Sequence, residues 1–272
     1  MRRRWLIDGA IRSGDEGADG GFGTIWHRES GGIVSATPRG SVTVWSGIEL
    51  APGDGGELAG AGHEWYEAYR SEVLGRDREL SSGRLYERID DRRPLPAGRP
   101  ARPGTDGTKY LTEFVFPERH RATGEATPPD GRSIPFVPDG PEGPFATAWS
   151  AAYRYLAETA PATVEPYAIY MVGVDVPSGF GAGEFEQFDD FYTNVHMPEV
   201  AARRRCLRAS RYERVEVQPA GEPQTPQFIA IYELDEAGAA RRRHVGGAYS
   251  AGPPVWKRHT NTWRFWYRLV AD

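Results

Sequence analysis

The stretch FYTNVHMPEVAARRRCLRASRYERVE, residues 191–216, has a counterpart earlier in the chain, WYEAYRSEVLGRDRELSSGRLYERID, residues 65–90. Tyr86-Glu87-Arg88 matches Tyr212-Glu213-Arg214 at an offset of 212 − 86 = 126 residues, and aromatic pairs open both stretches. The repeat indicates that the chain contains two copies of one structural unit.

Each copy lies between two stretches in which apolar and polar residues alternate. This period of two is typical of half-buried β-strands. The stretches before the copies are SVTVWSGIEL (41–50) and YAIYMVGVDV (167–176), and those after them are KYLTEFVF (109–116) and QFIAIYEL (227–234). We expect strands at these four places and helices between them.

A second helix is predicted after the later strand of each copy, over residues 144–158 and 235–250. The aromatic run NTWRFWYRLV (261–270) predicts a closing strand in the second copy. The order strand, helix, strand, strand, helix, strand is that of a ferredoxin-like unit. The sequence therefore predicts an α+β fold of two such units, the first within residues 1–160 with an N-terminal extension, and the second within residues 161–272.

The first unit is incomplete in the sequence pattern. Its closing strand competes with the opening strand of the second unit for residues 164–176, or else comes from Trp5–Ile11 or Ile33–Thr37. Residues 121–144 are dense in proline and glycine and have no periodicity, which predicts an inserted loop. A loop of this length covers a pocket mouth or is disordered.

Composition excludes several classes of protein. The net charge of −5 argues against general nucleic-acid binding, and the arginine runs 203–205 and 241–243 are typical of solvated helix faces. A single cysteine, Cys206, leaves no intrachain disulfide and no cysteine-rich zinc site, and no metal is expected. No apolar run approaches the roughly 18 residues that span a membrane, and the apolar run after the basic start is too short for a signal peptide. We expect a cytoplasmic protein.

The most informative segment is FDDFYTNVHMPEV, residues 188–200. Phe188, Phe191, Tyr192 and Val195 recur at helical spacing and predict a helix face that lies on a sheet. Pro198 has no N–H, its ring clashes with the carbonyl four residues earlier, and the residue before it is disfavoured in helical angles. We therefore expect the helix to kink or restart around residues 196–198.

His196 lies beside this expected break. An imidazole there can titrate near neutral pH and act as an acid or a base, or it can simply cap the freed backbone groups. Tyr192, one turn earlier, is either a partner of His196 or a core aromatic. The other histidines are weaker candidates because they lie in loops, at helix starts or in charged runs, namely His27, His63, His120, His244 and His259.

The segment from residue 188 through ASRYERVE and PQFIAIYELD resembles the dimeric α+β barrel superfamily, and most of all its EthD-like branch. The signature of that branch is an aromatic-Tyr pair followed by His-x-Pro, here Phe191-Tyr192 and His196-Met197-Pro198. The likeness covers residues 165–270, and residues 41–116 loosely. It implies that the two units pack sheet to sheet into one barrel within the chain, with a mostly apolar ligand cavity between a sheet and its helices.

The resemblance implies a cofactor-independent enzyme of secondary metabolism that acts on an aromatic or polyketide-like small molecule, as a cyclase, dehydratase, isomerase or monooxygenase. His196 would be the acid or base, Tyr192 would orient an oxygen, and Asp189 or Asp190 would set the histidine tautomer. The residues expected to contact the substrate are Phe188, Phe191, Trp263, Phe265 and Trp266. The alternatives are a non-catalytic binder or structural member of a biosynthetic complex, and a barrel that binds haem through His196. A homodimer of such pseudo-dimers is a further expectation.

The first copy departs from this pattern. Arg70 stands at the position of His196, and Glu72 at that of Pro198. A guanidinium is permanently charged and cannot exchange protons, so Arg70 is expected to reach solvent or to pair with Glu67 or Glu72. The candidate site is therefore predicted in the second unit alone.

Overall fold

The computed structural model describes residues 41–50, 64–65, 67–69, 71, 82–89, 108–116, 145–161, 163–218, 225–241 and 248–271. The strands are β1 (Val42–Leu50), β2 (Ser82–Arg88), β3 (Tyr110–Phe116), β4 (Phe145–Glu158), β5 (Ala168–Asp175), β6 (Arg208–Gln218), β7 (Phe228–Leu234) and β8 (Thr260–Ala271). The helices are α2 (Ala182–Phe191), the π-helical turn η2 (Tyr192–His196), α3 (Met197–Arg204), α4 (Glu236–Ala240) and the 3₁₀ turn η3 (Pro254–Arg258).

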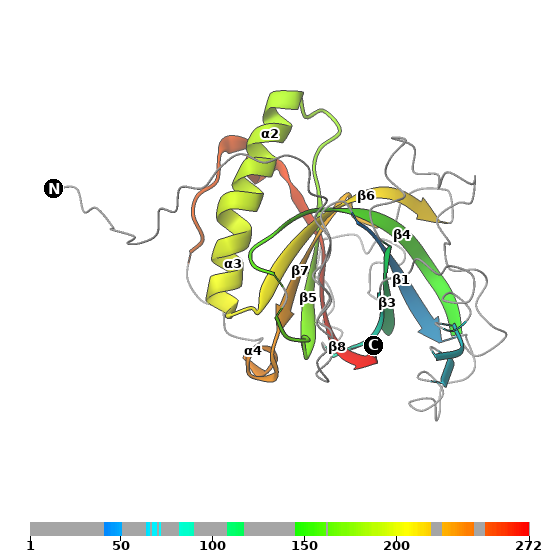
Figure 1. The fold of residues 1–272 in the computed structure, drawn as a ribbon. Coiled ribbons are helices and arrows are strands. Elements are labelled where there is room, and N and C mark those ends of the chain that lie inside the picture. Colours follow the sequence, from blue (N-terminus) through cyan, green and yellow to red (C-terminus); the bar gives the residue numbers. More distant parts are fainter. Residues whose placement is uncertain are drawn as a thin grey trace, which may run out of the picture. The chain divides into compact units, whose positions relative to one another are not determined.

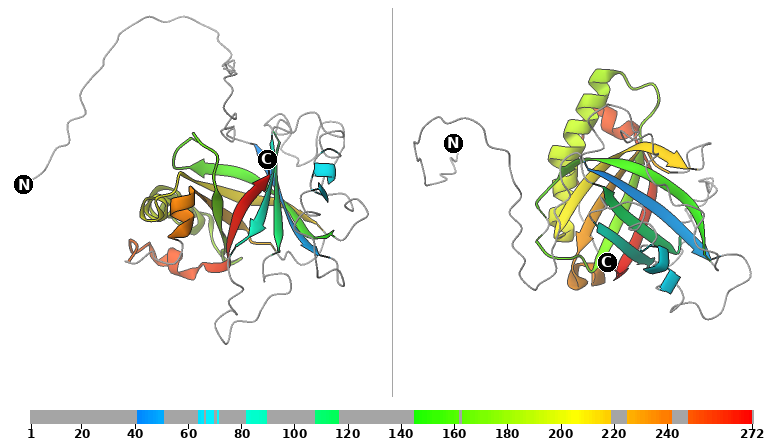
Figure 2. Two further views of the ribbon diagram at one scale, coloured as in Figure 1. Left: turned by 90° about the horizontal axis from the view of Figure 1, so that it is seen from below. Right: turned by 45° about the vertical axis from the view of Figure 1, so that its right-hand side comes forward.

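The eight strands of the described residues close into one antiparallel barrel in the order β1-β3-β2-β8-β5-β7-β6-β4. Closure leaves none of these strands with a free edge. Figure 1 shows α2 and α3 in line as one helical rod outside the strands of the second half, and Figure 2 shows green β4 between blue β1 and yellow β6. The barrel is complete within one chain, so a second copy is not needed to close it, and a homodimer stays a prediction.

The strand order is the same in the two halves of the barrel. The first half runs β4-β1-β3-β2 and the second half runs β8-β5-β7-β6, which is the strand order of a ferredoxin-like unit. The register repeats as well, because Val44 pairs with Phe114 and Ala152 as Tyr170 pairs with Tyr232 and Trp266. The prediction of an α+β barrel made of two ferredoxin-like units is confirmed.

The helix predicted over residues 144–158 is wrong, because this segment is the strand β4. Its alanines and its Leu156 gave the segment the composition of a helix, but Ala151, Tyr153 and Tyr155 alternate with Ala152 across the two faces of the sheet. Its place in the barrel overrides the local preference. β4 is also the missing closing strand of the first half, since it pairs with β1 throughout.

Two further expectations about the strands and helices have different outcomes. Residues 168–175 belong to the second half as β5, so they are not the closing strand of the first half. Of the helix predicted over residues 235–250, Glu236–Ala240 is helical and is capped by the Asp235 carboxylate, which accepts from the Gly238 N–H. Residues 248–250 are not helical, and residues 242–247 lie outside the described residues. The strand candidates at Trp5–Ile11 and Ile33–Thr37, Arg70 and Glu72, and the loop at 121–144 lie outside the described residues.

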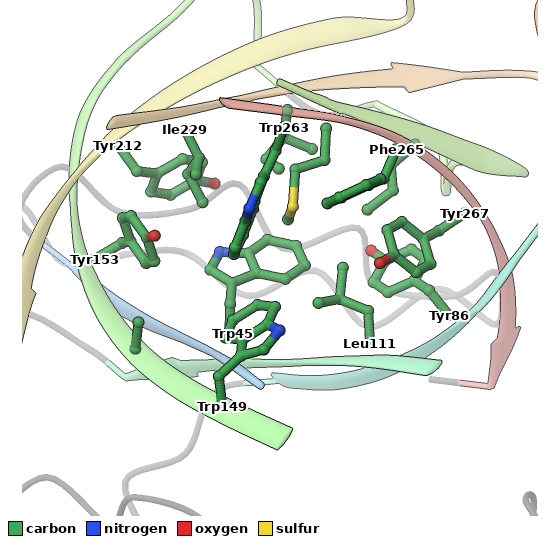
Figure 3. Close-up of a cluster of buried hydrophobic side chains, with 14 of the residues drawn as sticks. Trp45, Tyr86, Leu111, Trp149, Tyr153, Tyr212, Ile229, Trp263, Phe265 and Tyr267 are labelled. Carbon is green, nitrogen blue, oxygen red and sulfur yellow. The ribbon is translucent and has the colours of Figure 1, made fainter. Parts of the chain in front are cut away.

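The interior of the barrel is packed with aromatic side chains. Trp149 of β4 and Trp263 of β8 occupy equivalent places and contact each other, with ring centroids 4.9 Å apart. Figure 3 shows them with Trp45 in the middle of the barrel. Both tryptophans lie over a glycine at which the strand register shifts, Gly47 in β1 and Gly173 in β5, where a Cβ atom would collide with neighbouring side chains. The repeat therefore extends to the packing of the barrel interior.

Charged residues also face the inside of the barrel. Arg84 pairs with Glu113 at 3.4 Å, and Tyr86 donates to the same carboxylate at 3.0 Å. In the second half Arg208 pairs with Glu233. Burial raises the pKa of Glu113, which the nearby guanidinium opposes. Each of these two arginines inside the barrel thus has its own carboxylate, which offsets the high cost of burying its charge.

Candidate functional site

The helix that carries His196 does not break at Pro198. Met197, the residue before the proline, has helical angles of φ −60° and ψ −46°. Its N–H donates to the carbonyl of Tyr192, five residues earlier, which is the bond of a π-turn. The expected kink is absent, but the expected restart is present, because α-helical hydrogen bonding resumes as α3 at Met197 after the π-turn. The wider π-turn accommodates a proline that would clash in an α-helix, and α2 and α3 remain in line (Figure 1).

The π-turn changes which side chains meet the sheet. One extra residue per turn moves the buried position from Val195, which is half-buried, to Met197, which is fully buried. Phe188 and Tyr192 precede it on the buried face, and Val200 follows. The predicted face is thus correct for its first two turns and is displaced afterwards. His196 lies at the edge of this face, beside the buried stripe.

Aromatic rings surround His196. Its ring centroid is 4.6 Å from that of Trp256, 5.2 Å from Tyr249 and 5.6 Å from Tyr192, and Phe191 is 6.3 Å away. The Nδ1 atom is buried and has no hydrogen-bond partner among the described residues. An imidazole nitrogen left in this state is available to a ligand.

The surroundings of His196 keep its imidazole neutral. Burial is the largest cause that lowers its pKa, to about 4, and the nearby His259 and Arg264 act in the same direction, while Glu199 opposes them. At neutral pH the ring therefore carries no charge. The neutral ring can accept a proton or a hydrogen bond, or bind a metal, but it does not act as a general acid.

A segment after α4 covers the outer side of the helix. Ser250 is bound through both its N–H and its hydroxyl to the Glu199 carboxylate, and Arg203 donates to the carbonyl of Ala248. Trp256 of η3 then stacks on Phe188 at 5.5 Å as well as on His196. The segment thus completes the aromatic surround of the histidine.

Three residues of this surround were not predicted as site residues, namely Tyr249, Trp256 and His259. His259 was set aside as a loop histidine, yet its ring lies 4.1 Å from Trp256 and is hydrogen-bonded through both nitrogens, to the Trp256 carbonyl and to Asn261. The local sequence YSAGPPVWKRH predicts only a loop. No pattern within it indicates which helix it packs against.

Tyr192 is part of the core. It is fully buried, and its hydroxyl is hydrogen-bonded to Tyr232 of β7. Burial raises the pKa of Tyr192 to about 12, although the charge of Arg211 lowers it somewhat. Its T-shaped contact with His196 makes it a wall of the histidine site. Both interpretations of this residue, core aromatic and neighbour of His196, describe its position.

Asp189 and Asp190 have other partners than His196. The carboxylate of Asp189 accepts from Arg211 at 2.5 Å, and that of Asp190 accepts from the side chain of Asn194 at 2.7 Å. The structure therefore does not bring either of them onto the imidazole. His259 is the titratable group whose charge has the largest effect on His196.

Arg211 is a buried residue that was not singled out from the sequence. Its side chain is 0% exposed, and its guanidinium lies 4.5 Å over the ring of Tyr192. It donates to the carboxylate and the carbonyl of Asp189 and to the hydroxyl of Thr193. Arg211 on β6 thus connects the sheet to the helix around the start of the π-turn. This connection helps to fix the position of His196 relative to the sheet.

The expected substrate-contacting residues fall on two sides of the sheet. Phe188, Phe191 and Trp266 lie on the helix side with His196. Trp263 and Phe265 point into the barrel, because alternate residues of β8 face opposite ways. The structure brings Phe191 onto the histidine and links Phe188 to it through Trp256, leaves Trp266 on the same side of the sheet, and separates the other two from it.

Three or more potential metal-ligating side chains do not come together anywhere in the described part of the chain. Across the same residues, no helix combines the length and the apolar character needed to cross a membrane.

No protein-family model and no curated protein matches this sequence. Among solved structures, TA0507, a protein assigned as a chlorite dismutase, is similar with a TM-score of 0.44 and 9% identity, over 86% of this chain and 96% of that one. A tryptophan-to-phenylalanine mutant of the chlorite dismutase from Candidatus Nitrospira defluvii, in complex with cyanide, is similar with a TM-score of 0.39 and 9% identity, over 86% and 92% of the two chains. These likenesses are too distant to bear on function. Membership of the EthD-like branch stays a prediction.

Proposed function

We propose that the second half of the barrel binds an aromatic or polyketide-like small molecule beside His196, and that His196 acts as the general base of a cofactor-independent reaction. One observation carries the proposal: a neutral imidazole with a buried, unpartnered Nδ1 stands at a π-turn within a surround of aromatic rings. π-turns inside α-helices occur frequently at functional sites. The aromatic rings supply the apolar contacts typical of small-molecule sites.

The proposed chemistry begins with proton transfer. His196 takes a proton from an acidic C–H or O–H of the ligand, and the electron pair stays on the ligand as an enolate or phenolate. Arg264 stabilises that negative charge, since its positive charge reaches His196, Tyr192 and His259. Return of the proton at another atom gives isomerisation or cyclisation, and loss of hydroxide gives dehydration. Attack of the anion on dioxygen would give cofactor-free oxygenation.

Deuterium exchange tests this proposal without knowledge of the product. The protein is incubated in D₂O with hydroxylated aromatic compounds and β-dicarbonyl compounds, and the deuterium in each recovered compound is measured by mass spectrometry. Enzyme-dependent exchange that disappears in His196→Asn supports a general base. Binding of a compound with no exchange in either protein would point to a non-catalytic binder.

A second candidate function is haem binding through His196. The unpartnered imidazole nitrogen supports it, because a haem iron needs a single neutral histidine on one side. His196 would hold the iron, and Tyr249 and Trp256 would border the ring. Titration of the protein with haemin separates this candidate from the first. A Soret shift that His196→Ala abolishes would support it, and an identical spectrum in both proteins would rule against it.

A further inference from the structure

Arg204, near the end of α3, is half-buried and differs from the fully buried arginines of the described residues. Arg84, Arg208 and Arg211 each have a carboxylate partner, namely Glu113, Glu233 and Asp189. The Nε and Nη1 atoms of Arg204 are buried without any hydrogen-bond partner in the same part of the chain. A guanidinium cannot shed its proton, so this half-buried side chain keeps its charge without a carboxylate partner among the described residues.

The guanidinium of Arg204 packs against two aromatic rings. Its central carbon is 4.4 Å from the ring of Tyr170 and 5.3 Å from that of Trp266, and the two rings stack on each other at 4.6 Å. Cation–π contact offsets part of the cost of burial but satisfies none of the N–H donors. The donors are thus held in position with their partners missing.

A second cation lies on the same side of the sheet. Arg264 is exposed and stands two residues before Trp266 on β8, so both side chains point to the helix side. Its charge acts on His196 and Tyr192. Arg204 and Arg264 thus place two positive charges on the helix side of the sheet, where Tyr170 and Trp266 form an aromatic surface beneath Arg204.

We propose that Arg204 binds the anionic group of an aromatic acid, with Arg264 adding long-range attraction, so that the ligand of the second half is a carboxylate-bearing aromatic molecule. This inference rests on the proposed function for the location of the aromatic body beside His196. A planar guanidinium recognises a carboxylate through paired N–H donors, and the anion supplies the compensating charge that the protein lacks. The neutral imidazole leaves the chemistry at the other end of the molecule to His196.

Matched probes test the charge requirement. 2-Naphthoate and 2-naphthamide have the same aromatic body and differ in the charge of one group. We expect the wild-type protein to bind the naphthoate at least tenfold more tightly than the amide, by calorimetry, because a charge-assisted pair is replaced by a neutral one. Arg204→Met should abolish that preference and leave affinity for the amide within about twofold. Arg241→Gln removes an equal charge from an exposed site on the chain and should leave the preference intact.

Thermal stability supplies an independent readout. Removing an unpaired buried charge is neutral or stabilising, so Arg204→Met should melt no lower than the wild type without ligand. A lower melting temperature together with an unchanged naphthoate preference would overturn the proposal and make Arg204 a structural residue. Failure of naphthoate to bind at millimolar concentration would overturn it as well.

His196→Asn separates this inference from the proposed function. It should retain the naphthoate preference, because the anion site is distinct from the imidazole. If His196→Asn loses deuterium exchange but prefers the naphthoate over the amide as strongly as the wild type does, both proposals are supported. Exchange that survives in His196→Asn while the preference remains would overturn the general base alone, and normal exchange without any preference would overturn the anion site alone.

Discussion

The helix-facing surfaces of the two halves have the same backbone and different chemistry. In the first half the equivalent register positions carry Val44, Phe114 and Ala152, with Leu85 on the next strand. In the second half the same positions carry Tyr170, Tyr232, Trp266 and Arg211. The first surface also contains hydroxyls, from Tyr69, Tyr110 and the hydrogen-bonded pair Ser46–Ser150, whereas the second places the buried cation of Arg211 under the helix of His196.

The barrel interior shows the opposite behaviour. Trp149 and Trp263 repeat, and so do Tyr86 and Tyr212. In the first half Trp45 of β1 pairs with Ala151 of β4, and at the equivalent place in the second half Met171 of β5 pairs with Phe265 of β8. The larger side chain therefore lies on the first strand of the pair in one half and on the second strand in the other. The interior is similar in the two halves, whereas the outer surface of the second half has a buried cation, Arg211, where the first has Leu85. This contrast supports the proposal of a site on that outer surface.

The largest expected effect separates the halves at one equivalent position. His196→Asn should reduce turnover by about 10² to 10⁴, as loss of a general base does, while the melting temperature stays near that of the wild type. Arg70→Ala, at the matching place of the first half, should change turnover little. Turnover is measured by deuterium exchange and stability by thermal unfolding. If the histidine variant keeps its activity and only loses stability, His196 is a structural residue.

Exchange of one residue between the two outer surfaces should reveal their different tolerance of charge. Leu85→Arg introduces an unpaired guanidinium into the apolar surface and should lower the free energy of unfolding by about 3–5 kcal/mol. Arg211→Leu should cost about 1–3 kcal/mol, because Asp189 is 43% exposed and can be hydrated when its partner is lost. Urea unfolding of both variants gives the comparison. Equal losses would mean that the surfaces are less distinct than their residues suggest.

The repeated interior predicts equal effects in the two halves. A Cβ atom at Gly173 would lie 2.6 Å from Pro226 and 2.8 Å from Trp263, and at Gly47 it would lie 2.6 Å from Thr108 and closer still to Trp149. Gly47→Ala and Gly173→Ala should therefore each cost about 1–3 kcal/mol of stability through overpacking. Gly179→Ala, where no atom lies within 4 Å of the added carbon, is the control and should be near neutral. A loss confined to one half would limit the repeat to the backbone.

Much of the fold was predictable because the repeat and the period-two strands are local signals. Tyr86-Glu87-Arg88 and Tyr212-Glu213-Arg214 lie at equivalent places on β2 and β6, as the offset predicts. The nature of β4 was not predictable, since its alanine-rich sequence favours a helix and its strand pairing depends on β1 and β6, which are distant in sequence. Tertiary context decides such segments.

The site was predictable where one segment contains it. His196, Tyr192, Phe188 and Phe191 come from a single helix, and the structure places them together. Trp256, Tyr249 and Arg211 reach His196 and its helix from other elements, and no local pattern indicates that approach. The π-turn was also missed, because Pro198 in the sequence signals a break and gives no sign of a wider turn that avoids it.

The smallest expected effect concerns pH, and it again distinguishes the halves, since Arg70 does not titrate. The pKa of His196 in the folded protein is about 4, below its ordinary value of 6.5, so the unfolded chain binds more protons between these values. Stability from the neutral imidazole is therefore complete above pH 6.5 and is lost as the pH falls towards 4. His196→Phe should reduce that loss, which urea unfolding at pH 7 and pH 4.5 measures.

Other groups titrate in the same range, so the comparison is the difference between variant and wild type. Burial also lowers the pKa of His259, which leaves part of the loss in place, and His259→Phe combined with His196→Phe should remove more of it. Glu113 acts in the opposite direction, because burial raises its pKa and protonation then favours the folded state. Hydrogen bonds from Ser250 lower the pKa of Glu199, so its carboxylate stays charged over most of this range. An identical pH dependence in His196→Phe and the wild type would show that the imidazole is hydrated in the folded protein, and would weaken the case for a buried base at this position.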